Sequence, residues 1–191
     1  MAGRQAKVIA PAQRYALLRH VRRHSDPVRS RVIVLLSVRA GMRAAEIAKL
    51  EWPMVLDADG NVSEQIAVED RIAKKKSGRS IPMHTDLQDA LIALRRQNVH
   101  DGPVILSQRG GAMRPNSIVN WFIGVYRELG FEGCSSHSGR RTFITQAARL
   151  THKAGGSLRD VQLLAGHQSI ETTQRYIDGD SAAQRRLIAL L

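Results

Sequence analysis

Residues 164–176 read LAGHQSIETTQRY, a pattern typical of a helix, a glycine turn and a second helix. Gly166 fits the end of a helix because glycine adopts the left-handed backbone conformation without steric cost. The turn then places His167 between two helices, and Tyr176 follows nine residues later. A lone tyrosine is commonly a packed amphipathic residue, but this spacing makes Tyr176 a candidate nucleophile.

A second polar stretch, residues 136–142, reads SHSGRRT just before a predicted helix. His137 and Arg140 are three positions apart, so they project to one side of the first helical turn. The free N–H groups of a helix start favour an anion, and an imidazole beside a guanidinium suits phosphate binding with proton transfer. The alternative interpretation of His137 is a capping or packed histidine.

Two further places upstream could carry chemistry. Residues 40–46 read AGMRAAE, where Arg43 and Glu46 share a helical face and form either a surface ion pair or part of a site. The second place is the KKKSGR run at residues 74–79, whose charges either protect a sheet edge or contact a polyanion.

The remaining pattern predicts one mainly helical domain with a small antiparallel sheet, an α+β fold. Its sheet pairs Gln65–Val68 with the residues after a tight turn at Ser77-Gly78. Thr85 and Gln88 fit a capping box at the start of a helix. The predicted helices are 12–23, 28–40, 44–50, 86–97, 115–129, 139–152, 157–165, 170–177 and one from about 181.

The charge of the 191-residue chain is strongly positive, with 29 Lys and Arg against 17 Asp and Glu, a formal net charge of +12. Residues 1–50 hold 11 basic and 2 acidic side chains, a net of +9. This excess indicates a polyanionic partner, nucleic acid first, although a solvated basic face or an anionic membrane surface would give the same balance. No stretch approaches the roughly 20 apolar residues of a membrane span.

Cysteine usage and the first residues point to a reducing compartment. Cys134 is the single cysteine, so it has no partner for an internal disulfide or a zinc knuckle. Residues 1–7 lack the apolar run of a secretory signal. We therefore expect a cytoplasmic protein with no membrane association.

Taken together, these four places resemble the catalytic domain of the tyrosine recombinase, or phage integrase, family over roughly residues 12–180. The resemblance implies these catalytic residues, in chain order: Arg43, Lys74, His137, Arg140, His167 and the nucleophile Tyr176. It also implies Glu46 as a supporting acid. The family lysine lies eight residues before a proline, which from Pro82 gives Lys74, while Lys76 stays open as an alternative general acid. Basic residues expected to contact DNA are Arg79, Arg141 and Arg175.

The resemblance implies a site-specific recombinase, an integrase of a mobile element, that breaks and rejoins DNA through a 3′-phosphotyrosyl intermediate. It implies no cofactor, metal or ATP. The expected partner is double-stranded DNA, with a tetramer on paired sites, a monomer or weak dimer without DNA, and a nucleoid-associated location. Residues 181–191 are expected to form a helix that is either exchanged between protomers or packed on its own core.

Two departures from the family pattern affect these expectations. The common box His-x-Leu-Arg-His-Thr here holds Ser138-Gly139 and Arg141. A basic tail at 1–11 stands where a full core-binding domain is usual, so we expect either weaker DNA binding, or help from an accessory DNA-binding protein or from the rest of a longer product. Two alternatives stay open: topoisomerase IB-like DNA relaxation, and a DNA-binding accessory or regulatory protein with the same fold.

Overall fold

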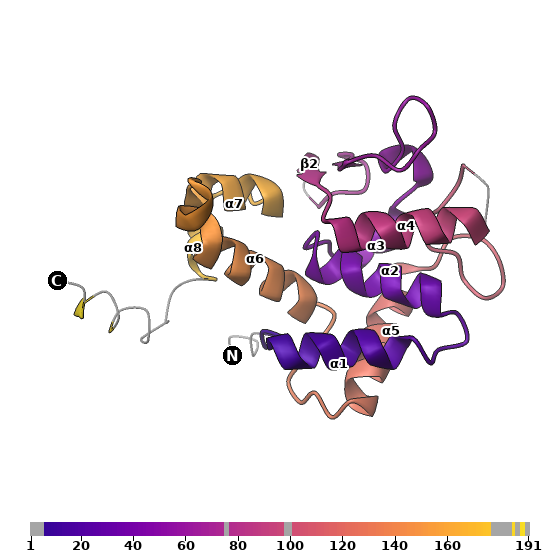
Figure 1. The fold of residues 1–191 in the computed structure, drawn as a ribbon, viewed down its shortest axis with the longest axis horizontal. Coiled ribbons are helices and arrows are strands. Elements are labelled where there is room, and N and C mark those ends of the chain that lie inside the picture. The colour runs from indigo at the N-terminus through magenta and orange to yellow at the C-terminus, as the bar shows by residue number, and fades with distance from the viewer. Residues whose placement is uncertain (1–5, 75–76, 98–100, 177–184, 186–187, 190–191) are drawn as a thin grey trace.

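The computed structural model describes residues 6–74, 77–97, 101–176, 185 and 188–189. Figure 1 shows their arrangement, with α1 to α5 gathered on one side and α6 reaching from them to α7 and α8. The helices are α1 (Pro11–Val21), α2 (Pro27–Val38), α3 (Ala44–Lys49), α4 (Thr85–Gln97), α5 (Pro115–Glu128), α6 (Ser138–Leu150), α7 (Leu158–Ala165) and α8 (Ile170–Gln174). Short 3₁₀ helices cover Trp52–Met54 and Thr151–Ala154.

Helix α2 runs through the hydrophobic core. Asp26 starts it, since its Oδ1 accepts the Arg29 N–H at 3.0 Å, and Pro27 stands at the first position, where a missing N–H costs little. Residues 32–36 are fully buried all the way round the helix. A helix that is apolar on every side must be covered on every side, and α2 contacts α1, α3, α4 and α6.

The sheet consists of β1 (Gln65–Val68) and β2 (Arg79–Pro82), paired antiparallel with Val68 opposite Arg79. Ile66, Val68 and Ile81 are buried, as expected for strands with one face on the core. The predicted tight turn at Ser77-Gly78 is wrong. The register leaves residues 69–78 as the connection, and its end is fastened where the Gly78 N–H donates to Asp70 Oδ1 at 2.8 Å.

The capping box predicted for α4 is also wrong. Thr85 is already helical, and Nδ1 of His84 accepts the Asp86 N–H at 3.1 Å. The Gln88 amide points away from the helix start, toward the carbonyls of Val62 and Ser63 at 3.4 and 3.3 Å. Long-range packing therefore overrides the local capping pattern.

Helices α6 and α8 have slightly different bounds from those predicted. The helix predicted over 139–152 ends at Leu150, and α8 ends at Gln174. Position 177 and most of the segment predicted as a helix from about 181 lie outside the described residues. None of the described helices has the length and apolar character to cross a membrane.

Candidate active site

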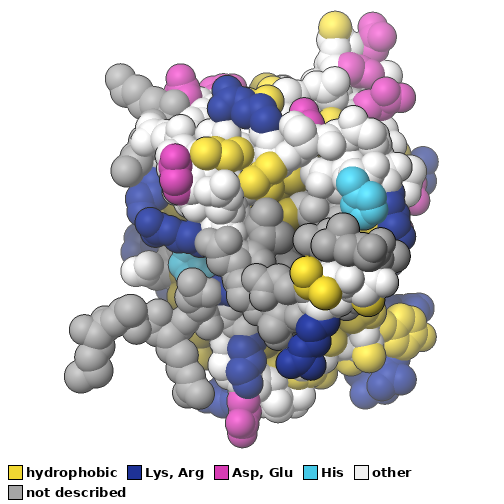
Figure 2. Space-filling model, turned by 90° about the vertical axis from the view of Figure 1, so that its left-hand side faces the viewer, with side chains coloured by type: hydrophobic (Ala, Val, Ile, Leu, Met, Phe, Trp, Pro, Cys, Tyr) yellow, Lys and Arg dark blue, Asp and Glu magenta, His cyan; other side chains and the backbone are white. Residues whose placement is uncertain are grey.

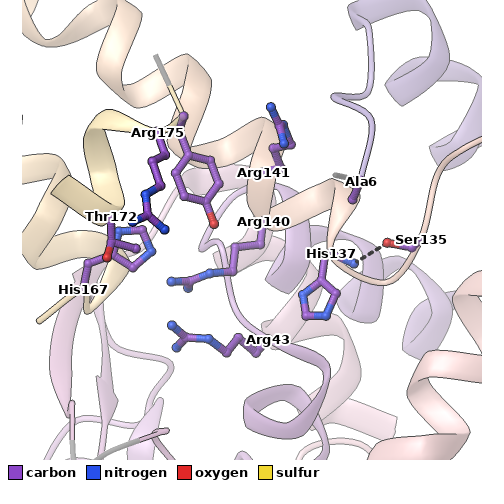
Figure 3. A pocket seen from close by; sticks show the side chains of 10 residues that line it. Ala6, Arg43, Ser135, His137, Arg140, Arg141, His167, Thr172 and Arg175 are labelled. Carbon is purple, nitrogen blue, oxygen red and sulfur yellow. Dashed lines mark hydrogen bonds between the residues drawn. The ribbon is translucent and has the colours of Figure 1, made fainter. Parts of the chain in front are cut away.

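A cavity of about 450 Å³ is lined by residues at the start of α3, at the start of α6, and in and after α8 (Figure 3). It brings together most of the residues singled out in the sequence. The lining residues are Ala6, Arg43, Ser135, His137, Arg140, Arg141, His167, Thr172, Arg175 and Tyr176. Among these described lining residues none is an aspartate, glutamate or cysteine, so the side chains that face the space suit an anion.

Arg43 reaches the cavity because Gly41 turns the chain sharply after α2. Gly41 has φ +61°, and a Cβ at this position would overlap the ring of Phe143. Arg43 then caps α3 in an extended conformation. Its N–H and Nη1 donate to the two carboxylate oxygens of Glu46 at 2.9 and 2.8 Å, which holds the guanidinium in one orientation.

Arg140 comes from the first turn of α6 and is only 3% exposed. Its Nη1 donates to the Gly41 carbonyl at 2.7 Å and its Nη2 to the Ala165 carbonyl at 2.6 Å. Burial, and then the charge of Arg43, lower the pKa of Arg140 to about 10, so it stays cationic at neutral pH. Figure 3 shows the guanidinium ends of Arg43 and Arg140 pointing the same way, which favours a bound anion.

Glu46 and Arg79 form an ion pair behind the cavity, with side chains 1% and 4% exposed. Two guanidinium nitrogens of Arg79 donate to the Glu46 carboxylate at 3.1 and 3.0 Å, and Nε donates to the Leu164 carbonyl at 2.9 Å. Burial acts to raise the pKa of Glu46, but Arg79 and Arg43 outweigh it and lower the pKa overall. Arg79 was expected to contact DNA; its side chain instead lies inside the protein and fastens β2 to α7.

His167 is held by the glycine turn that the sequence predicts and by two side chains, Gln162 and Thr173, that the sequence analysis missed. Gly166, with φ +62°, ends α7, and the buried amide of Gln162 donates to the His167 carbonyl at 2.9 Å. The ring atom Nδ1 lies 3.0 Å from Oγ1 of the buried Thr173. Its ring stacks on that of Tyr176 with centroids 5.5 Å apart. The sequence does hold a signal for Thr173. It is a polar residue within the stretch 164–176, at a position that is buried when α8 packs on the protein.

The two histidines of the cavity are biased toward the neutral form. Burial, followed by the charges of Arg140, Arg43 and Arg79, lowers the pKa of His167 to about 4. His137 stands at the N-terminal end of α6, where partial desolvation and then the charges of Arg140, Arg43 and Lys74 lower its pKa. A neutral imidazole can accept a proton, which a charged one cannot.

Of the four remaining predicted residues, three lie in the part of the chain that the structure describes. Arg141 and Arg175 line the cavity, and the guanidinium carbon of Arg141 is 5.9 Å from the centre of the Tyr176 ring. Lys74 is exposed in the connection between the strands and does not line the cavity, although its charge acts on His137. Lys76 lies outside the described residues.

The glycine inside the His137–Arg140 box has a packing reason. A Cβ at Gly139 would overlap the Ser37 hydroxyl of α2. Helix α6 therefore approaches α2 more closely than a leucine would allow, and α2 and α6 are in contact. This packing accounts for the glycine in the box, and His137 and Arg140 at its two ends match the family pattern.

We expect the free energy of unfolding to fall as the pH drops from about 6.5 to 4. His167 in the unfolded chain takes up its proton near its ordinary pKa of 6.5, whereas the folded protein resists protonation until about 4. Above pH 6.5 His167 is neutral in both states, whereas between pH 6.5 and 4 mainly the unfolded chain binds the proton, which lowers the free energy of unfolding by about 3 kcal/mol in total. Urea unfolding followed by circular dichroism at several pH values measures this loss of stability. His167→Asn should reduce the dependence of the free energy of unfolding on pH, and substitution of the exposed His152 by Asn should not. An equal pH dependence in both variants would contradict the assignment to His167.

Comparisons with known proteins agree with this geometry. The sequence model described as Phage integrase family matches residues 7–182. The tyrosine recombinase XerC of Herpetosiphon aurantiacus is 29% identical over an alignment of 202 positions, which covers 96% of this chain and 62% of that protein. The chain thus spans less than two thirds of this curated relative.

Solved structures share the fold. The integrase of the Tn1549 transposon, in complex with a circular intermediate DNA, has a TM-score of 0.77 at 19% identity, covering 100% of this chain and 67% of that one. The XerA recombinase has a TM-score of 0.74 at 19% identity, covering 100% and 65%. The mainly helical fold with a small antiparallel sheet is confirmed as that of a tyrosine recombinase catalytic domain. The chain belongs to the phage integrase family.

Proposed function

We propose that the chain acts as the catalytic domain of a site-specific recombinase that cleaves and rejoins DNA through a 3′-phosphotyrosyl intermediate. One observation carries the proposal: a single cavity is lined by Tyr176, by the paired guanidinium groups of Arg43 and Arg140, and by His137 and His167. A phenol nucleophile, charge stabilisation and proton-accepting groups are the components that phosphoryl transfer to a tyrosine requires.

In the forward step the Tyr176 oxygen attacks the scissile phosphorus as the bond to the 5′ oxygen breaks. Negative charge gathers on the non-bridging oxygens, where Arg43 and the outer N–H groups of Arg140 can donate. Because the phosphotyrosyl link conserves the energy of the broken phosphoester, a 5′-hydroxyl can reverse the step without ATP. When that hydroxyl belongs to another strand, the product is a recombinant.

Two proton transfers accompany this reaction, one from the attacking phenol and one to the departing 5′ oxygen. His137, whose pKa is lowered, is proposed to accept the phenol proton, and the neutral His167 to hydrogen-bond the phosphate while its ring stacks on Tyr176. Lys74 is proposed to protonate the departing 5′ oxygen. Its exposed position allows the strand connection to approach the DNA from outside the cavity.

The assignment of the general acid can be tested with a 5′-phosphorothiolate, whose sulfur leaves without protonation. Lys74→Ala should cleave an ordinary duplex slowly and the phosphorothiolate at close to the wild-type rate, because the modified leaving group makes the acid unnecessary. Lys76→Ala is the matched comparison, and single-turnover cleavage is the measurement. Rescue of the Lys76 variant alone would transfer the role to that residue.

The partners follow from the proposed activity. The basic side chains that line the cavity, and the Lys and Arg side chains that form most of the charged surface in the lower half of Figure 2, favour double-stranded DNA. We propose a tetramer on paired sites, a monomer or weak dimer without DNA, and help from an accessory DNA-binding protein. The domain limits of 1–11, 12–180 and 181–191, and a cytoplasmic, nucleoid-associated location, belong to the same proposal.

A nicked suicide duplex tests the central claim. The chain is incubated with a pool of such duplexes carrying random sequence around the nick, and covalent products are isolated under denaturing conditions and sequenced. We expect a protein–DNA adduct that mass spectrometry locates on Tyr176. A pool that binds the protein but yields no adduct would overturn the enzyme proposal, and exchange between two selected duplexes separates recombination from topoisomerase-like relaxation.

A further inference from the structure

Three side chains of metal-binding types, two histidines and a glutamate, meet outside the cavity of the candidate active site. His20 lies in the last turn of α1, His24 in the connection to α2, and Glu128 at the end of α5. One ligand atom from each lies within 4.8 Å of the other two, and His20 Nε2 is 2.8 Å from Glu128 Oε2. Small side-chain rotations therefore suffice to bring all three donors to one ion.

The surroundings orient these groups and leave room for an ion. Ser30 Oγ lies 3.2 Å from Nδ1 of His24, a contact of the kind that fixes the ring of a metal ligand. The His24 ring also meets Trp121 edge to face, with centroids 5.7 Å apart. A cavity of about 400 Å³, lined by His24, Asn120 and Glu128 among others, adjoins the cluster and gives space for a water ligand.

We propose that His20, His24 and Glu128 bind a divalent first-row transition metal ion, with Zn²⁺ as the best match. Two imidazoles and one carboxylate form a donor set that zinc takes in proteins, with a remaining position for water. Imidazole donors favour zinc, copper and nickel over calcium and magnesium, which prefer oxygen ligands. The competing interpretation is a plain His20–Glu128 ion pair. The two interpretations differ in whether the cluster binds Zn²⁺ and whether zinc raises the Tm.

The ion would fasten the end of α1 to the end of α5. The opposite end of α1 is already tied to the active-site helix α6, because the Ile9 N–H donates to Thr142 Oγ1 at 2.8 Å and Arg14 Nη1 to Gln146 Oε1 at 3.0 Å. The metal therefore stabilises the helix that braces α6, without contact to the cavity itself. Its role is structural.

The test uses the untagged full chain, stripped with a chelator and titrated with ZnCl₂ and, separately, with CoCl₂. We expect saturable binding of one Zn²⁺, and a rise in Tm of about 5–10 °C when free zinc exceeds its Kd a hundredfold. Visible absorption of the Co²⁺ form should report nitrogen and oxygen ligands. Co²⁺ should also quench the fluorescence of Trp121, and Trp121→Phe should remove that quenching.

Variants decide whether these three residues are the ligands. His20→Ala, His24→Ala and Glu128→Gln should each lose the binding and the Tm rise, while His152→Ala and the active-site variant His137→Ala should keep both. Thermal unfolding of each variant without metal shows whether that variant is folded. If a histidine variant is not folded, the fluorescence-quenching assay on Glu128→Gln tests the assignment in its place. Zinc binding that survives all three substitutions, or no saturable binding to the wild type, overturns the proposal.

Discussion

Tyr176→Phe should abolish the covalent DNA adduct while leaving DNA binding and stability unchanged. The substitution removes one oxygen, the atom that we propose bonds to phosphorus, and loss of a nucleophile costs several orders of magnitude in rate. The phenylalanine ring keeps the stacking on His167, which depends on the ring and not on the hydroxyl. The measurements are adduct formation on the suicide duplex, DNA affinity by titration, and Tm.

The sequence supplies a matched control because it holds only three tyrosines. Tyr15 in α1 is 70% exposed and lies outside the cavity, so Tyr15→Phe should form adduct at the wild-type rate. An adduct that persists in Tyr176→Phe would mean that another residue is the nucleophile. Loss of adduct in both variants would point to a defect common to the preparations.

Glu46→Gln should lower the free energy of unfolding by about 3–5 kcal/mol. The amide keeps the size of the carboxylate but removes its charge, which leaves the Arg79 guanidinium, whose side chain is 4% exposed, inside the protein without a counterion. It also weakens the contact that orients Arg43, at 2.8 Å in the wild type, so cleavage should fall as well. Urea unfolding measures the loss of stability, and single-turnover cleavage of the suicide duplex measures the loss of activity.

An exposed carboxylate provides the comparison for Glu46. Glu69→Gln also removes an arginine contact, to Arg71 at 2.6 Å, but both side chains are about half exposed and the expected cost is within about 1 kcal/mol. Adding Arg79→Met to Glu46→Gln should recover part of the stability, because the unpaired charge is then gone. Equal losses for Glu46→Gln and Glu69→Gln would show that burial of the pair is not what matters.

The parts of the site predicted well from sequence are those fixed by local geometry. A glycine that ends a helix, a histidine and arginine three positions apart, and a tyrosine nine residues after a histidine determine where side chains point within one segment. These signals led to the residues that now line one cavity, including His137, Arg140 and Tyr176. Their catalytic roles stay predictions until the variants are measured.

What the sequence could not provide are partners far apart in the chain. Arg140 donates to Gly41, 99 residues away, and Arg79 to Leu164, 85 residues away. Nothing in the lysine- and arginine-rich run at residues 74–79 indicates that the Arg79 side chain turns inward, so the sequence predicts Arg79 at the DNA surface. The strand connection at 69–78 was mispredicted for a related reason, since Ser77-Gly78 is a sound local turn signal and only the pairing of Val68 with Arg79 shows where the strands stop.

The last two carbonyls of α7 accept hydrogen bonds from two different arginines. Arg79 holds Leu164 from the strand that follows Lys74, and Arg140 holds Ala165 from the helix that begins beside His137. In the mechanism that we propose, the segment leading to His167 and Tyr176 is thus hydrogen-bonded at adjacent peptide groups to the strand that follows the general acid and to the helix that binds the phosphate. A displacement of the end of α7 would break both hydrogen bonds, so we expect the leaving-group side and the nucleophile side of the proposed site to respond together.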